Sequence, residues 1–218
     1  IECIAGKYVD VVGSNEASDC IDCVAGRYVD VAGSAALSEC KDCAAGKYVA
    51  VVGSSAASDC IDCAAGRYID VGGSDSDTDC IDCVAGKYVE DTGSALESDC
   101  IGCAAGKYSE AGTGQMLISV CDNLCSAGKW SSQTGLSSDA QCQGRCSAGK
   151  WSSQTGLTAD SQCTPCVAGK YSVAGSGQIS ISVCNNLCSA GKWSSQTGLA
   201  ADSQCTPCAA GKYSDAGT

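Results

Sequence analysis

Histidine and phenylalanine are absent from this 218-residue chain, which has one methionine and two prolines. Without histidine, the chain has no Ser-His-Asp or Cys-His nucleophile. Carboxylate pairs such as Asp19 and Asp22 recur from unit to unit, and a recurring pair is a poor candidate for a single active site. We therefore expect no enzymatic activity and no cofactor.

Bulky apolar side chains are also scarce. The chain has eleven aromatic residues, eight Tyr and three Trp, and its hydrophobic fraction of 44% consists largely of Ala, Val and Cys. Such a composition cannot fill a core at the usual density. No apolar run is long enough to cross a bilayer, so we expect no membrane insertion by this part of the chain.

Cysteine is abundant instead, with 21 residues. In a chain without histidine or Cys/His clusters, this frequency predicts a disulfide scaffold formed in an oxidising compartment rather than a zinc protein. We expect an extracellular protein, secreted or at the cell surface, in which covalent cross-links replace a large core.

Eleven of the cysteines open a six-residue phrase, Cys-x-Ala-Gly-Lys/Arg-Tyr/Trp. Each phrase ends on an aromatic preceded by a basic residue, and only Lys41 and Arg145 among the 13 basic residues lie outside it. The chain is therefore a repeat protein. We expect each basic residue to lie over a ring or to pair with a carboxylate of the next unit. We predict that the aromatic is the core of its unit, and the eleven are Tyr8, Tyr28, Tyr48, Tyr68, Tyr88, Tyr108, Trp130, Trp151, Tyr171, Trp193 and Tyr213.

The repeats fall into two segments. Residues 1–103 follow a strict 20-residue period and are acidic, whereas residues 104–218 contain variant units of 20–22 residues, three of them with Trp. We interpret both ends of the sequence as cut in the middle of a repeat. We expect small disulfide-rich β/irregular repeats with almost no helix, about eleven units in an elongated, rod-like array in which each unit touches only its neighbours.

Within a unit, the alternation at residues 29–31 predicts a strand and Gly33-Ser34 predicts a turn, which together indicate a small two-stranded loop. The longer runs at residues 116–120 and 179–183 are also strand-prone.

The spacing of the cysteines favours one pairing. The long interval is 17 or 18 residues in all ten cases, whereas the short interval varies between 3 and 4, so a bond across the long interval leaves the short one as a hinge. Cys208 then has no partner within the sequence. The predicted bonds join Cys3 with Cys20, Cys23 with Cys40, Cys43 with Cys60, Cys63 with Cys80, Cys83 with Cys100, Cys103 with Cys121, Cys125 with Cys142, Cys146 with Cys163, Cys166 with Cys184, and Cys188 with Cys205.

Two other uses of the cysteines remain open. Each short Cys-x-x-Cys could close on itself as in redox enzymes, although a redox site is one motif and here the spacing recurs along the chain. Four cysteines could also hold a metal ion, although a continuous ladder gives no reason for any four to do so.

The phrase Cys-x-Ala-Gly-Lys-Tyr, followed by Gly-Ser and Cys-x-x-Cys, resembles the ephrin-receptor-like cysteine-rich repeat, which is similar to tumour-necrosis-factor-receptor and EGF-like modules. The resemblance covers nearly the whole chain. It implies consecutive cysteine pairing around a small β-loop, a packed aromatic and an extracellular address. Long arrays of this kind resemble surface proteins of algae and other protists. The family often has Pro after the first cysteine, where this chain has residues such as Val24 and Ser126.

The charge bears on partners. The net charge is −12, and it is concentrated in residues 1–103, with 19 acidic and 6 basic residues, against 6 acidic and 7 basic residues in 104–218. An acidic surface argues against nucleic acid as a partner. The alternating acids of residues 75–79 lack the glycine turn and distal Glu of an EF-hand, so calcium is disfavoured. Exposed Ser and Thr turns, as at residues 131–134, make O-linked glycans a reasonable expectation.

These observations predict an extracellular structural protein that self-associates to form or decorate a surface fibril, hair or wall layer. We expect lateral or head-to-tail contacts to use residues 104–218. The alternative is the stalk of a receptor or adhesin that presents a binding domain encoded outside this sequence.

Overall fold

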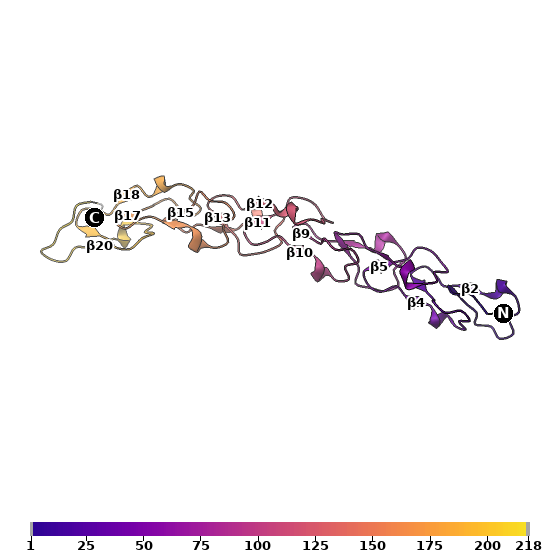
Figure 1. The fold of residues 1–218 in the computed structure, drawn as a ribbon. Coiled ribbons are helices and arrows are strands. Elements are labelled where there is room, and N and C mark those ends of the chain that lie inside the picture. The colour runs from indigo at the N-terminus through magenta and orange to yellow at the C-terminus, as the bar shows by residue number, and fades with distance from the viewer. Residues whose placement is uncertain (1, 217–218) are drawn as a thin grey trace. The chain divides into compact units, whose positions relative to one another are not determined.

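A computed structural model describes residues 2–216, and it confirms an array of small disulfide-closed repeats. Ten antiparallel two-stranded hairpins recur in the described residues, without any α-helix (Figure 1). The hairpins are β1 (Lys7–Tyr8) with β2 (Ile21–Asp22), β3 (Arg27–Tyr28) with β4 (Lys41–Asp42), β5 (Lys47–Tyr48) with β6 (Ile61–Asp62), β7 (Arg67–Tyr68) with β8 (Ile81–Asp82), β9 (Lys87–Tyr88) with β10 (Ile101–Gly102), β11 (Lys107–Tyr108) with β12 (Asn123–Leu124), β13 (Lys129–Trp130) with β14 (Gly144–Arg145), β15 (Lys150–Trp151) with β16 (Thr164–Pro165), β17 (Lys170–Tyr171) with β18 (Asn186–Leu187), and β19 (Lys192–Trp193) with β20 (Thr206–Pro207).

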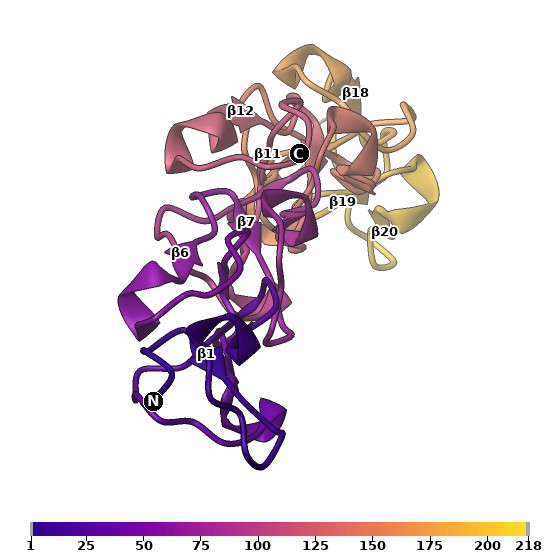
Figure 2. The same ribbon diagram turned by 90° about the vertical axis from the view of Figure 1, so that its right-hand side faces the viewer.

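A short 3-10 turn lies just before the second cysteine of each loop or includes it. Figure 2 shows these turns as coiled ribbons on the outer side of the loops. The turns are η1 (Ala17–Asp19), η2 (Leu37–Glu39), η3 (Ala57–Asp59), η4 (Asp77–Asp79), η5 (Glu97–Asp99), η6 (Ile118–Cys121), η7 (Asp139–Gln141), η8 (Asp160–Gln162), η9 (Ile181–Val183) and η10 (Asp202–Gln204).

The chain forms two compact units. The first comprises Ile1–Gly102 and Ala111–Val120, and the second comprises Cys103–Glu110 and Cys121–Thr218. Within each unit the hairpins follow one another in chain order (Figure 1). No helix among residues 2–216 is long and apolar enough to span a membrane.

Disulfides close the loops, and the structure joins the same consecutive pairs that the spacing predicts. Their sequence separations are 17 or 18 residues and their Cα atoms lie 5.3–5.9 Å apart. Cys208 is the one cysteine of the described residues that is not in a disulfide. In the chain-entropy model, each loop of this size is stabilised by roughly 3 kcal/mol.

The short interval between cysteines is not a hinge, contrary to the prediction. In the interval from Cys40 to Cys43, Lys41 and Asp42 form strand β4 and pair with Arg27 and Tyr28. Among the described residues the basic-aromatic dipeptide is the only partner strand of this link, so the same two residues of the phrase hold the connection to the next repeat. The link is therefore a hydrogen-bonded strand.

The strand predictions made from local patterns are wrong. Residues 29–31 follow strand β3 rather than forming one, and their alternation reflects a buried Val29 beside an exposed Val31. The runs at residues 116–120 and 179–183 contain the 3-10 turns η6 and η9 instead of strands. Within the described residues no neighbouring segment pairs with them in a ladder. Because β propensity depends on packing against a partner strand, these strand-prone residues do not form strands here.

In most repeats the 3-10 turn is held by an Asp, Glu or Gln side chain at its third position, whereas η6 and η9 have Val there. The Asp59 carboxylate accepts hydrogen bonds from the backbone N–H groups of Ser55 and Ala56, at 2.8 and 3.0 Å. Gln204 accepts from Ala200 and Ala201 in the same way. Such a bond satisfies donors at the start of a helical turn, and it explains the recurrent Asp, Glu or Gln before the second cysteine.

Candidate functional site: the repeat junction

Seven of the aromatic rings pack against the disulfide of the following repeat. Tyr28 belongs to the loop closed by Cys23 and Cys40, but it lies against Val49 and the disulfide between Cys43 and Cys60. Tyr8, Tyr48, Tyr68, Tyr108, Trp130 and Tyr171 are placed in the same way. The ring is therefore the core of a junction, and the prediction that it is the core of its own unit was wrong in this respect.

The last two aromatics differ from the rest. The side chain of Trp193 is 44% exposed and that of Tyr213 is 89% exposed, whereas Tyr8 and Tyr88 are 8% and 7% exposed. The prediction that Trp193 and Tyr213 are core residues is therefore wrong for the described structure. No disulfide of a following loop lies among the described residues to cover either ring.

One apolar side chain completes the interior of most loops, and its position differs between the two kinds of repeat. In the acidic repeats it follows the aromatic, as Val49, and a buried Ser54 follows the second glycine. In the Trp and related repeats the order is reversed, with a buried Ser131 after the aromatic and a buried Leu136 after the glycine. Both arrangements place one aliphatic side chain against the loop's own disulfide.

Backbone hydrogen bonds join successive repeats at regular positions. Gly26 N–H donates to the carbonyl of Val49 at 2.8 Å, and Val29 N–H donates to Ser54 at 3.1 Å. A parallel bridge between Tyr28 and Ser54 belongs to the same contact. Such bonds satisfy backbone groups that the two-residue strands leave unpaired.

Contacts also reach the second neighbour, so the prediction that a unit touches only adjacent units is wrong. Gly46 has φ +85°, and a Cβ atom added to it would overlap the carbonyl oxygen of Gly93, two repeats further along. Gly6 and Gly53 are related in the same way. Only glycine tolerates both the positive φ and this close approach, which accounts for the recurrent Gly of the phrase.

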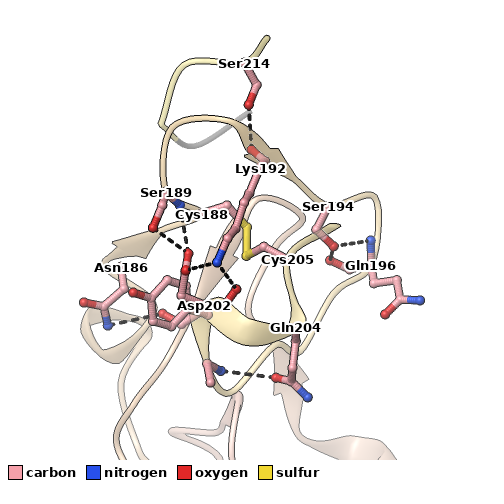
Figure 3. The surroundings of a disulfide bond; sticks show 12 residues. Asn186, Cys188, Ser189, Lys192, Ser194, Gln196, Asp202, Gln204, Cys205 and Ser214 are labelled. Carbon is pink, nitrogen blue, oxygen red and sulfur yellow. Dashed lines mark hydrogen bonds and ion pairs between the residues drawn. A yellow bond between two sulfur atoms is a disulfide. The ribbon is translucent and has the colours of Figure 1, made fainter. Parts of the chain in front are cut away.

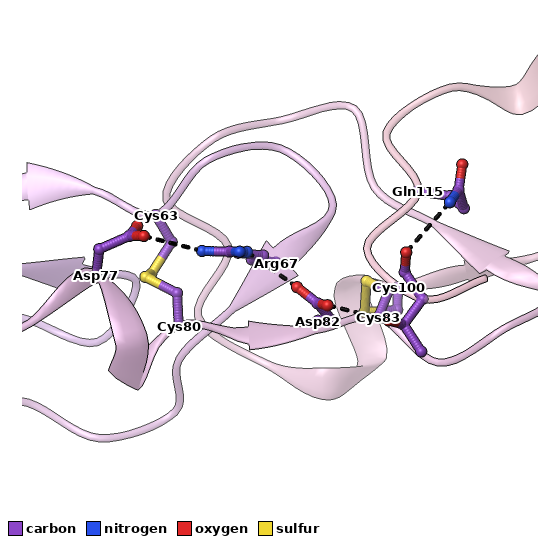
Figure 4. Close-up of polar contacts among 9 residues, drawn as sticks. Cys63, Arg67, Asp77, Cys80, Asp82, Cys83, Cys100 and Gln115 are labelled. Atoms are coloured by element: carbon purple, nitrogen blue, oxygen red, sulfur yellow. Dashed lines mark hydrogen bonds and ion pairs between the residues drawn. A yellow bond between two sulfur atoms is a disulfide. The ribbon is translucent and has the colours of Figure 1, made fainter.

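The basic residue of the phrase forms ion pairs at two kinds of position. In the first four repeats it pairs across the hairpin, as in the 2.7 Å contact of Arg27 with Asp42. Arg67 makes both pairs at once, with Asp82 across the hairpin at 2.9 Å and with Asp77 at the start of η4 at 3.1 Å (Figure 4). Asp82 raises the pKa of Arg67, with Asp77 as the second cause.

In the Trp repeats, the ion pair lies within the loop. Lys192 pairs with Asp202 at the start of η10, and the same carboxylate accepts the N–H and hydroxyl of Ser189 (Figure 3). The Lys192 hydrogen bond, followed by the bonds from Ser189, lowers the pKa of Asp202 from 3.8 to about 2. Lys129 with Asp139 and Lys150 with Asp160 repeat the arrangement at 2.6 Å.

The pKa values of Asp139 and Asp160 are also lowered. Burial alone would raise the pKa of each carboxyl, but the lysine hydrogen bond and the bonds from Ser126 and Ser147 outweigh it. The acid at this position thus ties the beginning of the loop to its 3-10 turn.

Lys41, one of the two basic residues outside the phrase, lies 5.8 Å from the ring centroid of Tyr28 and pairs with Asp30 at 2.8 Å. The hydrogen bond between them is the main cause that lowers the pKa of Asp30 and raises that of Lys41. Here a cation lies over a ring, as expected, but it is not the cation of the phrase.

Lys107 and Lys170 have neither kind of ion pair within residues 2–216. The position across the hairpin is Leu124 for Lys107 and Leu187 for Lys170, and the first residue of the 3-10 turn is Ile118 or Ile181 in place of an acid. These two loops are also the ones with an 18-residue separation. The substitution of Asp by Ile at this position is visible in the sequence, although only the register shows what it removes.

The acidic run at residues 75–79 is used in local contacts. Asp79 caps η4 by accepting from Asp75 and Ser76, and Asp77 pairs with Arg67. No cluster of three or more His, Cys, Asp or Glu side chains with a metal-binding arrangement occurs in the described part of the chain. The Cys208 thiol donates to the Ser214 hydroxyl at 3.4 Å.

The chain gives no match when compared with models of known protein families or with curated proteins. Rings and glycines of the phrase, with the cations of the first four repeats, hold one repeat to another, and a disulfide closes each of the ten loops. Disulfide-rich repeats of this kind are typical of extracellular structural proteins.

Proposed function

We propose that this chain is part of an extracellular structural protein whose repeats form or decorate a surface fibril, hair or wall layer. The observation that carries the proposal is that the ring, the glycine and the cation of the six-residue phrase all make structural contacts within the array. Its ring packs on the next disulfide, its glycine fits against the second repeat along, and its cation, in most repeats, pairs with a nearby carboxylate. Each of these residues serves the continuity of the array.

The similarity to ephrin-receptor-like repeats fits this role, and we propose it as the family to which the repeat belongs. The same proposal includes no catalytic function and no resident cofactor. It includes O-linked glycans on hydroxyls such as those of Ser132 and Thr134, which are exposed. Intact-mass measurement of material from its natural source tests the glycans, because an unmodified mass contradicts them.

The experiment that tests the structural role is negative-stain microscopy of the oxidised chain secreted from a eukaryotic host. We expect filaments or laterally associated assemblies whose formation increases with protein concentration. Single particles at every concentration, joined in the natural protein to a globular binding domain, would instead support a receptor or adhesin stalk.

A further inference from the structure

A pocket of about 260 Å³ lies in the second unit beside Trp151. Its walls come from two successive loops and the link between them, and they include Pro165, Val167, Lys170 and Ile181. Val167 and Ile181 are more than half exposed, at 57% and 62%, so the pocket presents apolar surface to solvent.

The pocket also has unused donors. Lys170 lacks both kinds of ion pair, because Leu187 and Ile181 occupy the positions where other repeats have acids. Trp151 makes no indole hydrogen bond within residues 2–216, whereas the Trp130 Nε1–H donates to the carbonyl of Arg145 at 3.2 Å. None of the described residues lining the pocket is acidic.

Two pockets of the first unit have acidic linings instead. One, of about 610 Å³, is lined by Glu90, Asp91 and Asp99, and a smaller one at the first repeat is lined by Asp19. A pocket with apolar walls and one unpaired cation therefore faces solvent in a chain whose other half carries the acids. It suits a ligand that presents a carboxylate beside a small aliphatic group.

The chain itself contains such a ligand. In the first repeat, Asp10 is followed by Val11 and the fully exposed Val12, and in the fourth repeat Asp70 is followed by the exposed Val71. Neither carboxylate has an ion pair or hydrogen bond within the described residues.

The other acidic repeats lack this combination. Asp30 is neutralised by Lys41 in the second repeat, Ala50 replaces the acid in the third, and Asp91 replaces the valine after Glu90 in the fifth. Two of the five acidic repeats therefore present a free carboxylate beside an exposed valine.

We propose that the pocket at Trp151 and Lys170 binds the Asp-Val loop of a second copy of this chain, either at Asp10 or at Asp70. The proposal rests on the structural role proposed above and names the contact through which copies associate. Such a contact joins different surfaces of the two copies, so it can add further copies without closing a ring. Attraction between the opposite charges would make the association weaken with salt.

The test uses the full oxidised chain with the Cys208 thiol alkylated, and it measures self-association by sedimentation velocity at low and high salt. We expect Lys170→Glu and Ile181→Asp to weaken association by roughly tenfold or more. Lys212→Glu is the matched control, because Lys212 is exposed, lies outside the pocket and gives the same change in net charge. We expect it to associate like the unmodified chain.

A charge exchange makes the test specific. The Asp10→Lys, Asp70→Lys double variant should associate with itself as weakly as Lys170→Glu does. A mixture of the two should associate. The unchanged Lys170 pocket of the double variant meets the unchanged Asp-Val loops of the Lys170→Glu variant, and the exchanged Glu and Lys also have opposite charges. A mixture that stays dissociated contradicts the proposed contact.

The outcomes separate the two proposals. An unmodified chain that remains monomeric at all concentrations overturns the contact and the assembly role together. An unmodified chain that assembles, with Lys170→Glu assembling equally well, overturns the contact alone. If Lys170→Glu abolishes binding to a uronic-acid oligosaccharide and leaves self-association unchanged, the pocket is a glycan site and the contact between copies is wrong.

Discussion

Gly46 lies against the carbonyl oxygen of Gly93, although a complete repeat separates the two in the sequence. Contacts in the array are therefore not limited to adjacent repeats. Inside the first unit, a repeat also packs against the repeat two positions further along the chain. In nearest-neighbour repeat proteins a defect weakens one interface. Here a defect at one glycine reaches three consecutive repeats.

The first prediction concerns that glycine. Gly46→Ala should destabilise the first unit by more than backbone strain alone, which costs about 1–2 kcal/mol at a positive φ. The added methyl group has no room, and overpacking costs about 1–3 kcal/mol more. Gly191→Ala is the matched control, because Gly191 occupies the same place in the phrase with φ +79° and has no atom within 4 Å of an added Cβ. Hydrogen exchange reports the change, in residues 43–60 and 83–100 for Gly46→Ala and in residues 188–205 for Gly191→Ala. Equal effects of the two variants on their own segments would show that the close approach is unimportant.

The second prediction concerns the exchanged interior positions. Leu136→Ser should destabilise its loop by about 2–4 kcal/mol, because it removes the buried aliphatic side chain that covers the disulfide of Cys125 and Cys142. Adding Ser131→Val should recover part of the loss, since acidic repeats place valine at that position. Denaturant unfolding followed by tryptophan fluorescence checks this. A double variant as unstable as Leu136→Ser would show that the two positions do not fill the same space.

The third prediction concerns a single disulfide. Replacing Cys63 and Cys80 together by Ser should cost about 3 kcal/mol through loop entropy and should expose Tyr48, which packs on that bond. Hydrogen exchange should increase in residues 47–80 more than elsewhere. Cys208→Ser is the control, because Cys208 is not in a disulfide, and it should leave exchange in this segment unchanged. Uniform exchange along the first unit after loss of the bond would show that the loop is not a local unit of stability.

The fourth prediction concerns acid. The pKa of Asp202 is lowered from 3.8 to about 2, so its ionised form stabilises the fold at pH values above 3.8 and this contribution is lost as the pH falls through about 2. Asp202→Asn should therefore be less stable than the unmodified chain near neutral pH, and the difference should shrink towards about pH 2. All three tryptophans belong to the second unit, so fluorescence-detected unfolding measures it. A difference that stays constant with pH would rule out the ion pair as its source.

The sequence allowed the repeat and its covalent pattern to be predicted because both are properties of spacing. An interval that stays at 17 or 18 residues while its neighbour varies indicates which cysteines close a loop of constant size. Seven of the aromatics are core residues, as predicted, but spacing does not say that Tyr28 packs against the disulfide of the following loop.

Other features could not be predicted because they depend on how one repeat is rotated against the next. The contact of Gly46 with Gly93 needs that rotation, and so does the pairing of strand β3 with the link at Lys41 and Asp42. Local patterns were misleading at residues 116–120, where Met116 and Leu117 lie just before a 3-10 turn and Ile118 opens it, all three exposed to solvent. That Lys170 has no ion pair could be seen only from the structure. It depends on which residue lies across the hairpin from the lysine and which begins the 3-10 turn of the same loop.

The placement of the disulfides determines how the chain would respond to pulling. A force applied along the backbone enters a loop at its first cysteine, crosses the sulfur bridge and leaves through the short link, so most of the loop carries no load. For the third repeat, that path spans 5.8 Å between the Cα atoms of Cys43 and Cys60, and the link to the next cysteine adds roughly 10 Å at most. A stretch of about 20 residues without the bridge would lengthen to roughly 70 Å. The oxidised array therefore behaves as a nearly inextensible cord, and reduction would convert it into one that stretches several-fold.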